Sequence, residues 1–308
     1  GSQILTGHVI AKAEGGADGV SRVVARAIDS EGRHVAGSDK IIDCDTVTLG
    51  IAAVPVIELL EAAGCRIEHA PRRGGHVPVL VGGQNTTVSG IHAIGDAAGF
   101  WPEKSMNSEI ATAEARRAVT AIIDGQADVI EPVASGHGGG ADQDTYLKRW
   151  VRASVVEADG GGDGEPFVCQ CEDVTARDIL EVRPPRYLGW SPPTQKPSDL
   201  ASLLGAGPPN PDQVKRLTRA GMGVCQGRRC REQVAALLAL ESGVPISEIP
   251  LATFRPPVRP IRLDQLATTN EAVEMSDNWE GWFGIPSMWL APWQIGPDGR
   301  PLEDLDDD

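Results

Sequence analysis

The feature that most constrains this chain is the grouping of four of its six cysteines. Cys169 and Cys171 form a C-x-C pair, and Cys225 and Cys230 form a C-x4-C pair in a later segment. Two thiols one residue apart do not readily bond to each other, because a disulfide requires a particular Cα spacing and direction. Both can face one metal centre, and four thiolates from two loops suit Zn²⁺ or an iron–sulfur cluster. The C-x-C spacing is atypical of zinc and favours [2Fe–2S]; four unrelated buried cysteines remain the alternative.

The residues around the second cysteine pair suit a metal centre. Gly223 and Gly227 allow the loop to bend around a cluster. Backbone N–H groups at the start of the following helix would offset the negative charge of the thiolates. Arg228, Arg229 and Arg231 add positive charge there. The remaining cysteines, Cys44 and Cys65, are expected to be ordinary buried thiols.

The charge balance narrows the class of partner. The chain has 28 basic and 43 acidic residues, which gives a net charge of −15. Such a chain repels phosphate backbones and anionic membranes, so no nucleic-acid partner is expected. We find no apolar run long enough for a transmembrane segment and no secretory leader, and we therefore expect a cytoplasmic protein. In that reducing setting, clustered cysteines favour metal binding over disulfides.

Composition and periodicity divide the chain into four regions. Residues 1–133 are expected to be α/β and to form part of a nucleotide-binding region, followed by a Gly/Asp-rich linker with a short helix over 134–165. Residues 166–262 form a helical cysteine module with a proline-rich insertion at 184–206, and residues 263–308 form a tryptophan-rich, acidic tail. The patterns predict strands at 23–28, 40–49 and 77–81, and helices at 56–63, 108–123, 176 onward, 210–221 and 231–240. Thr175 with Asp178, and Asn210, are predicted helix caps.

A short apolar strand ends in Gly95-Asp96. Gly95 permits close approach of the backbone, and the Asp96 carboxylate can accept a hydrogen bond from a ribityl hydroxyl. The N–H groups from Ala97 to Gly99 would then face a pyrophosphate. The alternative is a simple turn. No G-x-G-x-x-G follows a strand near the start of the sequence, so the first dinucleotide fingerprint is missing.

These motifs carry a resemblance to known proteins. The C-x-C segment at 169–175 and the segment at 213–230 resemble the [2Fe–2S] domain related to bacterioferritin-associated ferredoxin. More narrowly, they resemble that domain in the α subunits of flavin-dependent opine oxidases, D-hydroxyproline dehydrogenases and hydrogen cyanide synthases. Residues 253–260 resemble the end of that domain, and residues 87–96 resemble the second flavin motif of flavoproteins with two dinucleotide-binding domains. The resemblance covers residues 3–262.

The resemblance implies a fold and a function. The fold is the C-terminal part of a flavoprotein with two dinucleotide-binding domains, followed by a small helical [2Fe–2S] module. The function is that of an electron-transfer subunit in an oxidoreductase acting on C–N bonds of an amino acid, imino acid or opine. Cys169, Cys171, Cys225 and Cys230 would hold the cluster, and Gly95, Asp96 and Ala97 would contact FAD.

The resemblance also implies partners. The FAD would be shared with an N-terminal half of the flavin domain, supplied by another segment or chain. A separate β subunit would oxidise the substrate with its own FAD, and some relatives hold FMN at a subunit interface. The alternatives are a subunit like that of a hydrogen cyanide synthase, which oxidises glycine, and a zinc-stabilised interaction module.

Other residues receive plainer interpretations. No catalytic residue is assigned. The six histidines show no ligand spacing, and His92 is expected to pack. Glu114 is expected on a solvated helix face. The tryptophans between Trp279 and Trp293 would form either a local core or anchors on the β subunit.

Overall fold

The computed structural model describes residues 4–50, 53–99, 104, 107–124, 140–158, 165–184, 199–254, 256–268 and 270–277. The chain divides into two compact units, Gly1–Val258 and Arg259–Asp308. In the second unit the described helices are α9 (Leu263–Thr268) and α10 (Val273–Ser276). The predicted tryptophan anchors lie outside the described residues. No helix in the described part of the chain is long and apolar enough to cross a membrane.

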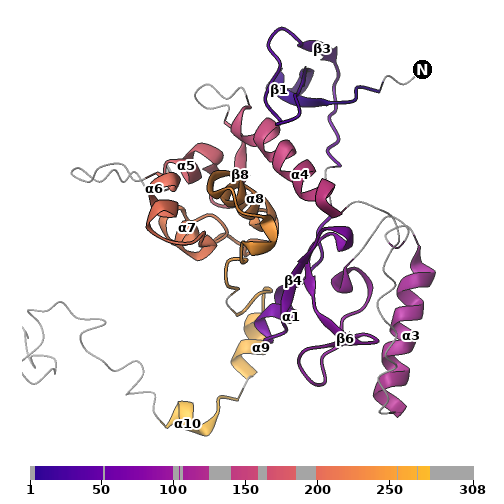
Figure 1. Ribbon diagram of the computed structural model, residues 1–308. Helices are drawn as coiled ribbons and strands as arrows, with labels where there is room; N and C mark the ends of the chain where they lie inside the picture. The colour runs from indigo at the N-terminus through magenta and orange to yellow at the C-terminus, as the bar shows by residue number, and fades with distance from the viewer. Residues whose placement is uncertain are drawn as a thin grey trace, which may run out of the picture. The chain divides into compact units, whose positions relative to one another are not determined.

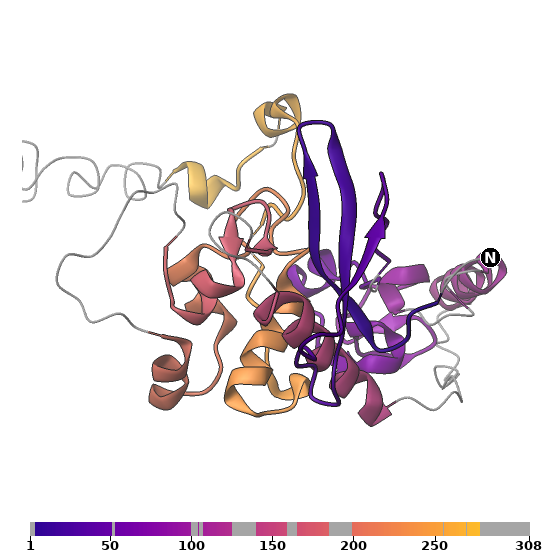
Figure 2. The same cartoon turned by 90° about the horizontal axis from the view of Figure 1, so that it is seen from above.

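The first unit begins with a three-stranded antiparallel sheet, in which β2 (Gly19–Ala27) lies between β1 (His8–Gly16) and β3 (Lys40–Asp43). Figure 2 shows β1 and β2 as a long hairpin with β3 at its side. β3 is shorter than the predicted strand at 40–49. The register pairs Asp43 with Arg22, close to the start of β2, so the later residues have little partner strand left.

The next elements are a short helix, α1 (Glu58–Ala62), and two small hairpins (Figure 1). β4 (Ile67–Ala70) pairs with β5 (Gly75–Pro78) across the 3-10 turn η1 (Pro71–Arg73), and β6 (Leu80–Gly82) pairs with β7 (Asn85–Thr86). The single strand predicted at 77–81 is therefore two strands. They are separated at Val79, whose N–H bonds to the Arg66 carbonyl.

The strand predicted to end at Gly95-Asp96 is reduced to one bridge. His92 pairs with Asn85, and the chain then enters the 3-10 turn η2 (Gly95–Ala98). The helix that follows, α3 (Ser108–Asp124), matches its prediction closely.

Helices and strands are mixed in the described chain, as the predicted α/β class requires. Every strand pair among the described residues is antiparallel, however, so the parallel sheet of a dinucleotide-binding domain is not present there. A parallel pair needs a crossover between two strands of the same sheet. The strands described here pair instead with strands that are close to them in the sequence.

The main core is helical and is centred on α8 (Arg231–Ser242), whose residues from Val234 to Ala239 are all buried. Around it lie α4 (Gly140–Val151), the π-helical turn η3 (Arg152–Val156), β8 (Phe167–Cys169), β9 (Val174–Thr175), α5 (Ala176–Leu180), α6 (Leu200–Ala206), α7 (Pro211–Thr218) and η6 (Ile246–Glu248). The core includes Cys169 and Cys230, so the sequence's most informative motif lies inside its best-packed region.

The two predicted helix caps are confirmed. Thr175 and Asp178 form a reciprocal capping box on α5, and the Asn210 side chain accepts from the N–H groups of Asp212 and Gln213. The predicted end of α7 at 221 was too late. Arg219 adopts a left-handed conformation, φ 64°, which ends the helix.

The helix expected inside a linker is part of the core. α4 packs against α8, and Val151 and Val155 are core residues. The Lys148 ammonium also donates to the Val244 carbonyl at 3.0 Å. The expected insertion likewise contributes α6, through the buried Leu200. The boundaries at 133, 165 and 262 stay predictions.

Candidate functional site

The structure brings the four cysteines together in two pairs. Cys169 ends β8, Cys171 lies in the turn after it, and Cys225 and Cys230 lie at the two ends of the loop that leads into α8. The thiol of Cys169 contacts that of Cys230, and the thiol of Cys171 contacts that of Cys225. The first pair is buried and the second is half-buried.

Backbone N–H groups surround the Cys169 sulfur. The N–H of Gly221 lies 3.4 Å from this sulfur, and those of Cys171 and Glu172 are also directed at it. The hydrogen bond with the Cys230 thiol, together with these N–H groups, lowers the pKa of Cys169 to about 6 against the opposing effect of burial. The same contact and burial raise the pKa of Cys230. These groups therefore stabilise negative charge on the Cys169 sulfur in particular, as a thiolate ligand of a metal requires. At Cys171, by contrast, a backbone hydrogen bond is outweighed by burial and the neighbouring thiols, which raise its pKa.

Glycines allow the two loops to approach each other. A Cβ on Gly223 would lie 2.3 Å from the Cβ of Cys171, so no other residue fits there without displacement. Gly227 has a φ of 77°, in the left-handed region that favours glycine. Both glycines therefore allow the tight path of this loop, and its bending around a cluster stays a prediction. The four thiols, the N–H donors and this close approach fit a metal–sulfur centre.

The arginines near the loop have other partners. The Arg231 guanidinium is buried and lies 3.0 Å from Glu58 Oε1. Arg229 donates to the Gln170 side chain at 3.4 Å, and Arg228 donates to the Val258 carbonyl at 3.5 Å. The expectation that Arg231 would offset thiolate charge is therefore wrong, because the Glu58 carboxylate already balances it.

The Gly95–Ala98 turn is held by a buried ion pair. Gly95 has a φ of 59°, and its N–H donates to the Glu114 carboxylate at 2.8 Å. The Lys104 ammonium donates to the carbonyls of Gly95 and Gly99, each at 2.7 Å, and lies 2.9 Å from Glu114. Glu114 is thus buried against the turn and does not lie on a solvated helix face. The sequence pattern revealed the role of neither Lys104 nor Glu114.

Asp96 and Ala97 sit at the open side of this turn. Asp96 is exposed and Ala97 is half-buried. The N–H of Gly99 bonds to the Asp96 carbonyl at 3.0 Å, so it closes the turn and does not face outward as predicted. The exposed Asp96 carboxylate fits an acceptor for a ribityl hydroxyl, on a backbone fixed by Lys104 and Glu114.

A second group of metal-ligating side chains was not predicted. His69, His76 and Glu232 place their donor atoms within 4.8 Å of one another. The histidines are seven positions apart in sequence, which is not a typical ligand spacing. The Pro-Arg-Arg-Gly turn between them was the available signal, since a hairpin centred on it places His69 opposite His76.

Comparison with known proteins gives these features a context. Residues 197–270 match the family model described as "Sarcosine oxidase A3 domain". The opine oxidase A subunit of Agrobacterium tumefaciens (strain Ach5) is 26% identical over 247 residues, which is 76% of this chain and 43% of that protein. The opine oxidase A subunit of Rhizobium meliloti is 26% identical over 239 residues, 75% of this chain and 40% of that protein.

Among solved structures, the L-proline dehydrogenase from P. horikoshii superposes with a TM-score of 0.48 at 19% sequence identity, covering 83% of this chain and 43% of that one. The chain thus spans less than half the length of the curated relatives that it matches. Three quarters of the chain nevertheless aligns with opine oxidase A subunits, and the A3 match covers the loop with Cys225 and Cys230. The chain is therefore similar to opine oxidase A subunits over three quarters of its length.

Proposed function

We propose that this chain is the electron-transfer part of a flavin- and iron–sulfur-dependent oxidoreductase that oxidises a C–N bond in an amino acid, imino acid or opine. The pairing of the four thiols carries the proposal. The relatives also support the proposal, because the curated homologues are named as subunits of opine oxidases. We place this complex in the cytoplasm, where a reducing setting keeps thiols available for metal binding.

The thiol arrangement supports [2Fe–2S] over zinc. A [2Fe–2S] cluster takes two thiolates on each of its two irons, whereas a zinc site gathers all four sulfurs around one ion. Here the Cys169 thiol is hydrogen-bonded to that of Cys230 and the Cys171 thiol to that of Cys225, and between the thiols of the two pairs the interaction is electrostatic only. The cluster would accept and pass on single electrons. The N–H groups of Gly221, Cys171 and Glu172 would hold its sulfur environment in place.

The flavin part of the proposal rests on the Gly95 turn. Asp96 would bind a ribityl hydroxyl of FAD, next to Gly95 and Ala97. Lys104 and Glu114 would keep that backbone in position before the flavin arrives. The remaining contacts to this FAD would come from the segment or chain that supplies the N-terminal half of the flavin domain, and an FMN would fit the family at a subunit interface.

The proposal includes a catalytic partner, because no residue of this chain is assigned to the chemical step. A β subunit with its own FAD would oxidise the substrate, and electrons would pass from it to the cluster. Co-expression of this chain with neighbouring flavoprotein genes, followed by affinity purification, tests this point. Purification of the chain as a lone, monodisperse monomer that binds FAD stoichiometrically would contradict it.

The cluster is tested on the full chain purified without oxygen. We expect two irons and two acid-labile sulfides per chain, a visible absorption spectrum, and an EPR signal after reduction. Cys225→Ser should abolish all three, while Cys44→Ser, outside the paired thiols, should leave them unchanged. A colourless protein with one zinc and no iron would replace this proposal by the zinc-stabilised module.

A further inference from the structure

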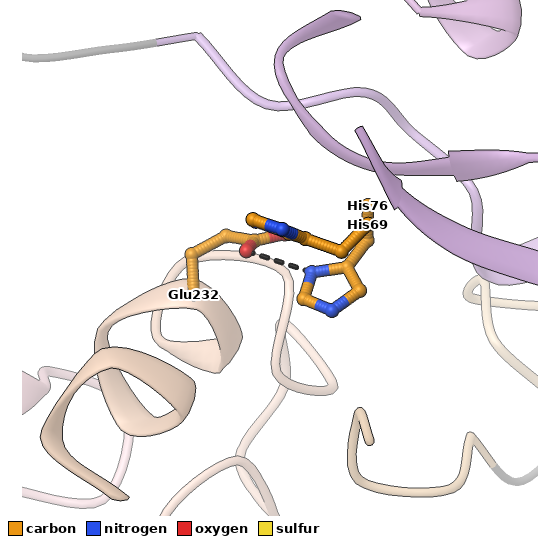
Figure 3. Close-up of side chains that lie close together, drawn as sticks. All are labelled: His69, His76 and Glu232. Carbon is orange, nitrogen blue, oxygen red and sulfur yellow. Dashed lines mark hydrogen bonds and ion pairs between the residues drawn. The ribbon is translucent and has the colours of Figure 1, made fainter. Parts of the chain in front are cut away.

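A compact group of nitrogen and oxygen donors lies outside both sites described above. His69 on β4 and His76 on β5 are directly opposite each other in the hairpin register. Their ring centroids are 4.8 Å apart, and cross-strand neighbours point to the same face of a sheet. Figure 3 shows both rings directed toward Glu232, which comes from the first turn of α8.

The three side chains are already close to the geometry of a metal site. His76 Nδ1 lies 2.9 Å from Glu232 Oε2, and the donor atoms of all three residues lie within 4.8 Å of one another. A tetrahedral ion bound at about 2.0–2.1 Å would space its ligand atoms about 3.4 Å apart. Small rotations of His69 and Glu232 would therefore suffice to bring the three donors onto one ion.

The surroundings supply both rigidity and charge. His76 is 4% exposed and Glu232 is 9% exposed, so the donors are largely held by packing. Arg231 Nε lies 3.5 Å from Glu232 Oε1, and the same guanidinium is paired with Glu58 at 3.0 Å. Glu61 also acts on His76 electrostatically. The two imidazoles and the Glu232 carboxylate together offer the nitrogen and oxygen donors that bind a divalent transition-metal ion.

One side of the group is open. A cavity of about 410 Å³ is lined by His69 and Glu232, with Tyr146 and Trp150 from α4 and the side chains of Arg228 and Arg229. A fourth ligand could therefore reach an ion held by the three residues. Three protein ligands with one open position are the pattern of a Zn²⁺ site that binds water or a small anion.

We propose that His69, His76 and Glu232 form a site for one divalent transition-metal ion of the Zn²⁺ class, separate from the cysteine centre, with its fourth position open to the cavity. The donor set of two imidazoles and one carboxylate suits Zn²⁺ and differs from the oxygen-rich cages of Ca²⁺. The ion would join the β4–β5 hairpin to the helix that follows Cys230.

The test uses the full chain with its thiols occupied by the iron–sulfur cluster, titrated with ZnCl₂ against a chromophoric chelator. We expect one Zn²⁺ per chain, with nitrogen and oxygen neighbours near 2.0–2.1 Å in X-ray absorption and no sulfur shell near 2.3 Å. A sulfur shell, or no zinc uptake by protein that keeps its iron, would overturn the proposal. This readout needs no activity, and iron analysis reports on the cluster separately, so failure of the cluster and failure of the zinc site are distinguishable.

Substitutions of the proposed ligands test where the ion binds. Glu232→Gln and His76→Gln should each weaken Zn²⁺ binding by about 100-fold or more, beyond the range of an outer-shell change. His8→Gln, at a histidine on β1 far from the group in sequence, is the matched control and should bind as the unmodified chain does. Iron content shows whether each variant is folded. Equal affinity in Glu232→Gln and the unmodified chain would overturn the proposal; if both ligand variants fail to fold, the absorption spectrum of the unmodified chain decides it.

Discussion

Arg231 Nη1 lies 3.0 Å from Glu58 Oε1, and the two side chains are only 3% and 1% exposed. Arg231 also donates to the Pro55 carbonyl, and its guanidinium lies 5.9 Å from the centre of the Phe254 ring. This arginine directly follows Cys230 in the sequence. The ion pair therefore fixes the start of α8, next to the cysteine loop, against the segment that carries α1.

Removing one partner of this ion pair should be costly. Glu58→Ala leaves the Arg231 charge buried without its carboxylate, and we expect the free energy of unfolding to fall by about 3–5 kcal/mol. Urea unfolding followed by circular dichroism measures it. Lys12→Ala is the control, because the Lys12–Glu14 pair is solvent-exposed and its loss should change the free energy of unfolding far less. If Glu58→Ala and Lys12→Ala lost the same stability, burial would not explain the contribution of the Glu58–Arg231 ion pair.

The close approach at Gly223 gives a second prediction. In Gly223→Ala the new methyl group would overlap Cys171, so the loop must shift and cluster occupancy should drop, with a loss of about 1–3 kcal/mol in stability. Iron per chain and urea unfolding report the two effects. Gly205→Ala is the matched control: its Cβ meets nothing within 4 Å inside α6, and it should stabilise the helix by about 0.5–1 kcal/mol. A Gly223→Ala protein with full iron content would contradict the close fit.

A third prediction concerns pH. Burial raises the pKa of Glu61, against the attraction of Arg231 and His76, and its Oε2 is buried without a hydrogen-bond partner. A carboxyl whose folded pKa is raised costs stability above its unfolded pKa of 4.5 and costs nothing well below it. Glu61→Gln should therefore raise the free energy of unfolding at pH 7, and the gain should shrink as the pH falls through the raised folded pKa and vanish below 4.5.

Urea unfolding at several pH values from neutral down to below the ordinary pKa of a glutamate measures this dependence. Glu31→Gln, at an exposed carboxylate, serves as the control. A Glu61→Gln gain that is the same at every pH would mean that packing, and not the carboxylate charge, is responsible.

The fourth prediction concerns flavin retention. Asp96→Ala would remove the proposed charge-assisted hydrogen bond to the flavin, and in the assembled complex we expect the flavin affinity to fall by about 1.5–3 kcal/mol, or roughly 10- to 150-fold. Asp96→Asn keeps a hydrogen-bond acceptor without the charge, so its flavin affinity should lie between those of the Asp96→Ala complex and the unmodified complex. Fluorescence of the flavin released on dilution measures the loss. An Asp96→Ala complex that holds its flavin as tightly as the unmodified complex would remove Asp96 from the site.

The sequence alone determined the parts of this protein that depend on neighbours in the chain. Capping by Thr175 and Asn210 follows from short side chains that bond to N–H groups two or three residues away, and the structure shows both caps. The need for glycine at Gly223 and Gly227 followed from the cysteine loop itself. The family resemblance was also carried by local motifs, and the relatives found for the chain confirm it.

The tertiary structure decided what depends on partners far away in the chain. Glu114 looked like a surface residue because helical periodicity does not reveal that the Lys104 ammonium packs against it. The short β3 and the antiparallel hairpins were decided by which strands were available to pair. Glu232 lies 156 positions from His76, and the two meet only because the packing of α8 brings its first turn to the β4–β5 hairpin. Burial and long-range pairing are properties of the packed chain, so local pattern predicted the cysteine loops and could not predict the histidine–glutamate group.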